Sequence, residues 1–452
     1  MQITRFIERN TPLIVIGSMI ECSLLVFLLA TETNNWSWLP LLFFAPFGIY
    51  LGALFLTNGW DSRDSEKTLL IIGFAVAFRL TLLFSGPVFS FDMYRYYWDG
   101  MVAANGINPY VYSPDATELS WLRDANWELV NHKYLKTGYP PLMELFFELL
   151  YVSFHSMQSY KISFFLFDIG TILIILLMLR DLGADIKYLI VYAWAPLPIV
   201  EISQTGHNDS MAVFLMMASF FMLLRGRRNL SSALMGLSVI SKLFPIFFVP
   251  VLFRAWGKKG ALIFFLVVGV FHIPFADVGP RIYSGLLYAV NTSFFNGSVF
   301  PAVTALLIRT DLFANPGFVA QLVIYSIYGI LLLQAIHGSV RQRVGPIGLM
   351  KTCFLLLGAL LLFNRSFFPW YIAWVLPFIV FYASRSWLLL SGSIFLSYLR
   401  YDALPPPPYE GIDATVSLVL GLVQYLPFYM LFAHELFTRK ILTRSPRDPQ
   451  LP

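Results

Sequence analysis

Charged residues are scarce in this chain of 452 residues: Asp, Glu, Lys and Arg together make up 13%, about half of the share in a typical soluble protein. Hydrophobic residues make up 58% and aromatic residues 17%. A water-soluble fold cannot bury that much apolar surface, so a lipid bilayer must be the solvent for most of the chain. The composition therefore predicts an integral membrane protein that crosses the bilayer many times, with membrane lipids as constant partners.

Motifs for several chemistries are also missing. The sequence has no Walker loop, dinucleotide fingerprint, HExxH helix or Cys/His zinc spacing, so we expect no cofactor and no metal site. The two cysteines, Cys22 and Cys353, both lie in apolar runs and are expected to be packing residues rather than a disulfide. The net charge of +5 is small and scattered, which argues against a nucleic-acid partner and fits basic cytoplasmic loops.

Apolar runs recur from residue 12 to residue 437 and predict an all-α fold of about 12–14 transmembrane helices. The expected helices are 12–31, 38–57, 68–86, 160–180, 187–203, 208–225, 229–243, 244–256, 259–275, 318–337, 347–363, 368–383, 386–401 and 412–437. The run 229–256 is divided because KLFP (242–245) places a charge and a proline in its middle. Two polar segments, 87–159 and 276–317, are expected to contain no continuous span.

The same pattern predicts three regions. Residues 1–67 hold two N-terminal transmembrane helices, and residues 68–400 form a membrane core that includes the long loop 87–159. Residues 401–452 add an outer Pro-rich loop, a last transmembrane helix and a cytoplasmic tail.

The basic residues predict the direction of the helices. With the N-terminus inside, most of the 31 Lys and Arg residues fall on predicted cytoplasmic segments. If 142–155 were a span, every later loop would change sides and this agreement would be lost. That segment carries Glu144 and Glu148 on an otherwise apolar helix, so we expect it to lie as an amphipathic helix at the outer membrane surface. The loop 87–159 is then extracytoplasmic.

Several polar groups fall at the predicted outer face. In SFDMYRYYWDG (90–100), Asp92 and Asp99 are seven residues apart and would share one face of a helix, with Tyr96 between them. Asp92 follows the exit from the membrane, and we interpret it as a functional carboxylate. Asp99 is either part of the same site or a solvated surface acid.

A second group, QTGHNDSM (204–211), lies at a predicted outer turn. Asn208 or Asp209 would cap the helix that follows if the group is only structural. His207 and Asp209 beside a glycine are more polar than a turn requires, so a functional role is the alternative.

Two cations and one further acid complete the set. Lys242, between two apolar halves, either extends its ammonium group to the membrane surface or binds an anion such as phosphate. Arg365, before the aromatic run FFPWY, either anchors a helix at the aromatic belt or contacts a phosphate. Asp168 lies inside a predicted span and must face protein or water, with no role assigned.

Taken in this order, the features resemble the GT-C superfamily of membrane glycosyltransferases. The likeness covers roughly residues 68–385 and is nearest to bacterial polyprenol-phosphate-mannose-dependent alpha-mannosyltransferases, with a distant similarity to the first mannosyltransferase of GPI-anchor synthesis. It rests on DMYRYYWDG with GINPY, and on YPPL, LPIVEISQTGHNDSM, GLSVISKLFPI and WYIAWVLP. It implies a GT-C-like helical bundle in which 68–400 is the catalytic core.

The resemblance also implies roles for the residues singled out above. Asp92 would be the general base, and Lys242 and Arg365 would bind the phosphate of a polyprenyl-phosphate sugar. Ser90 stands where an Asp-x-Asp motif would have its first acid, which leaves a metal requirement in doubt. The pocket for the sugar or the acceptor would be lined by Tyr96, Asp99, His207, Asn208 and Asp209.

The expected reaction moves a sugar, with mannose as the first choice, to a hydroxyl of a glycan, lipid or protein at the outer face, with inversion. The alternatives are another lipid-linked donor sugar, and a transporter or flippase of lipid-linked sugar. A transporter would place its charges near the bilayer midplane and show repeated halves, whereas these acids lie at one interface. We expect a bacterial cytoplasmic membrane, with the endoplasmic reticulum as the alternative because the sequence contains glycosylation-type triplets.

Overall fold

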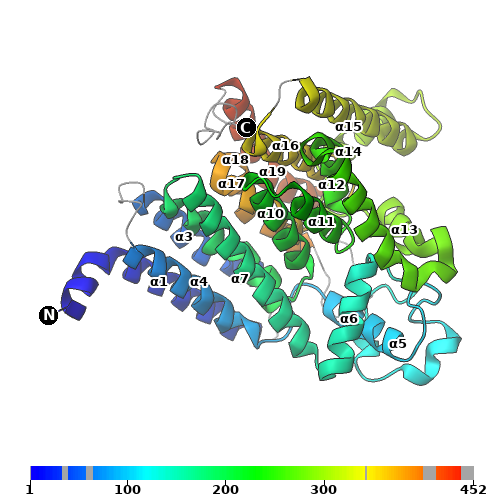
Figure 1. Cartoon of the computed structure of the whole chain (residues 1–452), viewed down its shortest axis with the longest axis horizontal. Helices are drawn as coiled ribbons and strands as arrows, with labels where there is room; N and C mark the ends of the chain where they lie inside the picture. Colours follow the sequence, from blue (N-terminus) through cyan, green and yellow to red (C-terminus); the bar gives the residue numbers. More distant parts are fainter. Residues whose placement is uncertain (1, 33–38, 58–64, 342–343, 401–413, 439–452) are drawn as a thin grey trace. The chain divides into compact units, whose positions relative to one another are not determined.

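A computed structural model describes residues 2–32, 39–57, 65–341, 344–400 and 414–438 of the chain (Figure 1). These residues are mainly helical and form no β-strand; two isolated bridges pair Phe295 and Asn296 with Ser366. The predicted all-α class is therefore confirmed. The predicted Pro-rich loop from residue 401 and the predicted basic tail from residue 439 lie outside the described residues.

The chain divides into two compact units, each built from separate stretches of sequence. Of the described residues, unit 1 contains those within 2–90, 161–210 and 372–438, and unit 2 contains those within 91–160 and 211–371. The boundaries predicted after residues 67 and 400 stay predictions.

Unit 1 holds the N-terminal helices, most of α7 and the C-terminal helices. Its elements are α1 (Gln2–Thr31), α2 (Leu39–Leu42), α3 (Phe44–Leu56), α4 (Ser65–Leu83), α7 (Met157–Asp181), η5 (Ile186–Leu189), α8 (Ile190–Ala193), α9 (Pro196–Pro198), the π-helix η6 (Ile199–Gln204), α17 (Ile372–Tyr382), α18 (Arg385–Ser393), η10 (Ile394–Arg400) and α19 (Ala414–Phe437). Helix α1 packs against α3 and α4.

Unit 2 holds the predicted outer loop and the central helices. Its elements are α5 (Asp92–Ala104), η3 (Thr117–Leu122), η4 (Trp127–Leu129), α6 (Pro141–Phe154), α10 (Asp209–Leu224, which starts in unit 1), α11 (Arg228–Val239), η7 (Phe244–Phe248), α12 (Val249–His272), η8 (Ile273–Tyr283), α13 (Ser284–Thr292), α14 (Val299–Thr310), α15 (Pro316–Arg341), α16 (Pro346–Phe363) and η9 (Pro369–Tyr371). Helix α5 packs against α6, and α11 against α12.

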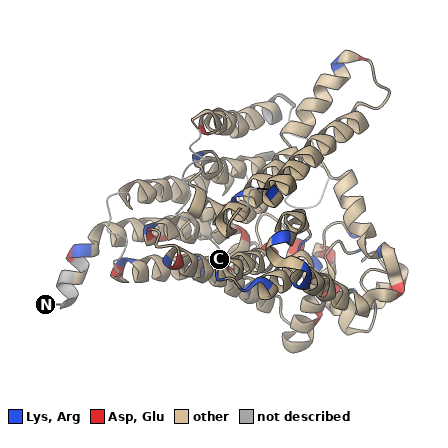
Figure 2. Cartoon of the chain, turned by 45° about the horizontal axis from the view of Figure 1, so that its top comes forward, with Lys and Arg blue, Asp and Glu red and all other residues tan. Residues whose placement is uncertain are grey.

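Among the described residues, seven helices are long and apolar enough to cross a membrane. They are Glu8–Thr31, Leu39–Leu56, Met157–Asp181, Phe244–Thr292, Pro316–Arg341, Pro346–Phe363 and Leu418–Phe437. A bent pair, Ile186–Ala193 with Pro196–Gln204, would make an eighth. Figure 2 shows helices that are tan over most of their length, with few charged residues. The chain is an integral multi-pass membrane protein.

This count is lower than the 12–14 helices expected, because hydropathy does not show where a helix bends or stops. Helix α12 is two helices that meet at a kink, because Gly257 inside it has non-helical dihedral angles, with φ at +70°. The break predicted between residues 256 and 259 is therefore confirmed. The polar segment 276–317 contains the short helices α13 and α14. The break at KLFP is confirmed, since α11 ends at Val239 and η7 begins at Phe244.

Asp168, which had no predicted role, forms a buried ion pair inside unit 1. Its Oδ2 accepts a hydrogen bond of 2.5 Å from Arg79 Nε, and both side chains are fully buried. Arg79 also donates to the carbonyl oxygens of Ala75 and Ala193, and the Tyr192 hydroxyl donates to Asp168. The pair therefore ties α4 and α7 to α8 where water cannot solvate either charge.

We expect Asp168→Asn to destabilise unit 1 by about 3–5 kcal/mol, because it leaves the Arg79 charge buried without its counter-ion. Thermal unfolding of the purified protein in detergent measures the loss. The matched control is Asp185→Asn, which removes the partner of Lys187 in a pair 3.4 Å apart whose acid is 43% exposed; there the change should stay below about 1 kcal/mol. Equal unfolding temperatures for Asp168→Asn and wild type would contradict a structural role for the pair.

Candidate functional site

Helices α5 and α6 hold the predicted site residues of the outer loop in one close-packed arrangement. Gly100 allows their contact: a Cβ at this position would lie 2.5 Å from the Phe147 carbonyl oxygen and 2.6 Å from the Tyr160 hydroxyl. The Tyr160 hydroxyl in turn donates to the Phe147 carbonyl. Any larger residue at 100 would separate the two helices.

Asp92 is the first residue of α5, where a negative side chain is favoured by the helix dipole. It is half-buried, and its Oδ1 accepts a hydrogen bond of 2.5 Å from Asn131 Nδ2. Asn131 was not predicted to belong to the site. It lies 39 residues away in a segment without helical periodicity, so no spacing rule indicates the contact.

Tyr96 lies one turn further along α5 and is fully buried. Its ring stacks on Phe147 at 4.8 Å and meets Tyr139 edge-on at 5.1 Å between centroids. These are favourable aromatic geometries. Tyr96 therefore packs against the ring of Tyr139, the first residue of the YPPL motif.

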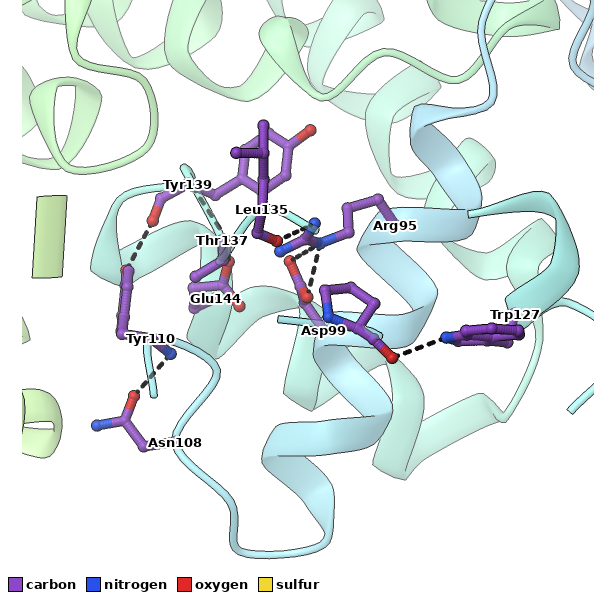
Figure 3. Close-up of polar contacts among 10 residues, drawn as sticks. Arg95, Asp99, Asn108, Tyr110, Trp127, Leu135, Thr137, Tyr139 and Glu144 are labelled. Atoms are coloured by element: carbon purple, nitrogen blue, oxygen red, sulfur yellow. Dashed lines mark hydrogen bonds and ion pairs between the residues drawn. The ribbon is translucent and has the colours of Figure 1, made fainter. Parts of the chain in front are cut away.

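Asp99 is 2% exposed and is committed to a neighbour on its own helix. Both of its carboxylate oxygens accept hydrogen bonds of 2.9 Å from Arg95 Nε, and Arg95 Nη1 donates to the Leu135 carbonyl at 2.9 Å (Figure 3). Burial raises the pKa of Asp99, and the guanidinium of Arg95 opposes that shift. The pair joins α5 to the segment before Tyr139.

Glu144 lies on the inner side of α6 and is fully buried. Its Oε1 accepts a hydrogen bond of 2.5 Å from the Thr137 hydroxyl. Burial raises the pKa of Glu144 well above its usual value, and the nearby charge of Asp99 adds to the effect. In a usual amphipathic helix the acids are exposed and the apolar residues are buried. In α6 the acid Glu144 points inward, while Leu149, Val152 and Phe154 are exposed.

Lys242 is brought to the same place from a distant part of the sequence. Its Nζ lies 5.9 Å from the centroid of the Tyr139 ring. The Leu142 amide, in the first turn of α6, donates to the Ile240 carbonyl at 3.1 Å and fixes the chain just before Lys242. Burial, followed by the negative charge of Asp92, raises the pKa of Tyr139 well above its usual value. Tyr96 and Lys242 therefore both lie beside the ring of Tyr139.

Arg365 belongs to unit 2 but has other neighbours. It follows α16, and its guanidinium carbon lies 3.9 Å from the centroid of Phe294 and 5.0 Å from that of Phe300. These cation–π contacts favour the anchoring interpretation of Arg365. A phosphate contact for this residue stays a prediction.

His207, Asn208 and Asp209 are all buried within unit 1. His207 Nε2 lies 3.4 Å from Glu201 Oε2, and Asp209 Oδ1 accepts a hydrogen bond of 2.6 Å from Trp374 Nε1. Glu201 is on the π-helix η6, whose six residues are all buried, and it also accepts from the Tyr398 hydroxyl. The sequence did not indicate these partners, because each comes from another element. A pocket role for the three residues stays a prediction.

The part of the chain that the structure describes contains no group of three or more His, Cys, Asp or Glu that could hold a metal ion. No cofactor site is assigned.

A family model described as alpha-(1->6)-mannopyranosyltransferase, N-terminal domain, matches residues 11–258, which is more than half of the chain. The match includes α5, α6 and Lys242, and it also includes the two N-terminal helices that the GT-C resemblance did not cover. Arg365 lies beyond it. No curated protein and no solved structure matches the chain.

We expect Glu144→Gln to flatten part of the pH dependence of stability. The pKa of Glu144 is raised in the folded protein, so the folded state binds the proton more tightly than the unfolded state. The wild-type protein should therefore lose stability as the pH rises above about 4.5, the usual value for Glu, and the Gln variant should lose less. Unfolding temperatures measured over a pH series test this. Glu118→Gln, at an exposed carboxyl, is the control, and parallel curves for wild type and Glu144→Gln would refute the assignment.

Proposed function

Because the chain belongs to the alpha-(1->6)-mannopyranosyltransferase family and is a mannosyltransferase, we propose that it takes mannose from a polyprenyl-phosphate donor and forms an alpha-(1->6) linkage on a glycan acceptor. The observation that carries this proposal is that the segment 131–139 has the carboxylate of Asp92 bonded at its first residue and the cation Lys242 beside its last residue, Tyr139. A transfer from a phosphate donor needs one group that accepts a proton and one that holds the leaving phosphate.

The donor class fits the surroundings of the site. A polyprenyl chain is an apolar anchor and would stay in the bilayer with the spanning helices, while its sugar phosphate reaches the polar segment 91–160. Helix α6, beside Asp92, exposes Leu149, Val152 and Phe154, as a helix in contact with lipid would. This supports a membrane-bound donor.

In the proposed reaction, Asp92 accepts the proton of the acceptor hydroxyl while that oxygen attacks the anomeric carbon of mannose. The new carbon–oxygen bond forms as the bond from the anomeric carbon to the phosphate oxygen breaks. The polyprenyl phosphate leaves with that electron pair, and Lys242 stabilises its charge. A single displacement inverts the anomeric carbon, so a beta-linked donor gives an alpha-linked product.

Of the two candidate phosphate ligands, Lys242 is preferred because it lies near Tyr139. Arg365 is the second candidate. No metal takes part in the proposed reaction. The family consists of enzymes, which argues against the flippase alternative. Another lipid-linked donor sugar stays an alternative, and the choice of donor in the transfer assay tests it. We place the site at the outer face of a bacterial cytoplasmic membrane, because the predicted inner loops are basic.

We expect Asp92→Asn to lower kcat about 10²–10⁴-fold, because the amide cannot accept the hydroxyl proton. The assay is mannose transfer from polyprenyl-phosphate mannose to an alpha-mannoside acceptor by the purified protein. The control is Asp115→Asn, which changes an exposed acid of the same loop that bonds to Ser113. Wild-type kcat in Asp92→Asn would rule out Asp92 as the base. Absence of transfer by the wild type would rule out the donor.

Lys242→Met should raise the KM for the donor about 10–100-fold, because a charge-assisted contact to phosphate is lost. Lys259→Met, at an exposed position on α12, is the matched control and should leave KM unchanged. If Lys242→Met keeps the wild-type KM while Arg365→Met raises it, the phosphate is bound at Arg365 instead.

A further inference from the structure

Residues 131–139, here called the strap, connect the two ends of the proposed site. The strap begins with Asn131, which donates to Asp92, and ends with Tyr139, which faces Lys242. Every residue of this connection lies in unit 2. What fixes the strap therefore fixes the position of the proposed base.

The lower side of the strap is tied to α5 and α6 by buried polar contacts. Arg95, held by both oxygens of Asp99, donates to the Leu135 carbonyl in the middle of the strap. Two residues later the Thr137 hydroxyl donates to Glu144. Figure 3 shows Arg95, Asp99 and Leu135 joined by hydrogen bonds, with Thr137 and Glu144 beside them. A buried guanidinium with three such bonds leaves little freedom to the backbone that it contacts.

The other side of the strap touches α13 directly, backbone against backbone. A Cβ on Gly285 would lie 2.4 Å from the carbonyl oxygens of Lys136 and Thr137, much closer than atoms can approach. A Cβ added to Gly138 of the strap would lie 3.5 Å from the Leu286 Cα, at ordinary contact distance. The strap is thus clamped from two sides, and only glycine at position 285 permits this approach.

The chain also turns sharply at the start of the strap. His132 has a φ of +47°, in the left-handed region that non-glycine residues rarely adopt, and the Leu135 amide donates to the His132 carbonyl at 2.8 Å. The turn directs Asn131 away from the middle of the strap and toward Asp92. Such a conformation persists only where its surroundings hold it.

We propose that Asn131 is a positioning residue for Asp92, and that the strap, clamped between α5, α6 and α13, presents its amide to the carboxylate. The bond of 2.5 Å fixes the orientation of the carboxylate before the acceptor arrives. This inference rests on the proposed function, because it takes Asp92 as the base.

Three substitutions at position 131 test the inference in the mannose-transfer assay. Asn131→Ala should lower kcat about 10–100-fold, with little change in the KM for the donor. Loss of a hydrogen bond that orients a functional side chain commonly has an effect of this size. Asn131→Gln keeps a donor amide and should recover part of the loss. Asn131→Asp sets a second carboxylate against Asp92, so it should be the least active and should shift the acid limb of the kcat/KM profile to higher pH.

The strap itself is tested by Gly285→Ala, which must push residues 136–137 away and should lower kcat in the same way. Gly269→Ala, where the added Cβ meets nothing within 4 Å, is its control. Asn126→Ala is the control for Asn131, because Asn126 is an exposed amide of the same loop that donates to Asp124. Both controls should keep wild-type kcat and unfolding temperature.

The outcomes separate this inference from the proposed function. If the wild type transfers mannose but Asn131→Ala keeps its kcat, or Asn131→Asp keeps the wild-type pH profile, the positioning role is wrong while the function stands. If the wild type transfers no mannose from polyprenyl-phosphate mannose, the proposed function fails first. A fall in kcat with an unchanged unfolding temperature in Asn131→Ala and Gly285→Ala supports the inference.

Discussion

A guanidinium buried beside a helix needs a partner for its charge, and on α5 Arg95 has one a single turn away in Asp99. The same guanidinium also donates to the Leu135 carbonyl, so the ion pair fixes residues 131–139 relative to α5. From there Asn131 reaches Asp92 and Tyr139 reaches Lys242. The arrangement of the candidate site thus depends on a charge pair within α5.

Buried polar groups in this protein serve two different purposes. In unit 1, Arg79 and Asp168 form a buried ion pair among helices where an unpaired charge would be very costly, and His207 lies 3.4 Å from Glu201. In unit 2, Asp92 is only half-buried and Lys242 is not fully enclosed. A base and a phosphate ligand must reach their substrates, so this difference in exposure is what separates the proposed chemistry from structural pairing. It agrees with the family, which is one of mannosyltransferases.

The sequence supported the all-α membrane class, the helix break at KLFP and the break near Gly257, because each follows from local composition or from a change in hydropathy. The choice of Asp92 as the base stays a prediction. The sequence did not reveal Asn131 or the approach of Lys242 to Tyr139. These contacts join residues far apart in the chain, and no periodicity records them. The inward direction of Glu144 depended on the partner helix α5, which a helix read alone does not specify.

The central claim is that Asp92 removes the proton of the acceptor hydroxyl. Its most direct measurement is the rate of mannose transfer by Asp92→Ala in the presence of added formate, a small carboxylate that can enter the space left by the side chain. We expect a very low rate of transfer by Asp92→Ala without formate and a rate that rises with formate concentration. The rate of Lys242→Met should not rise with formate. A rate for Asp92→Ala equal to wild type without formate would contradict it.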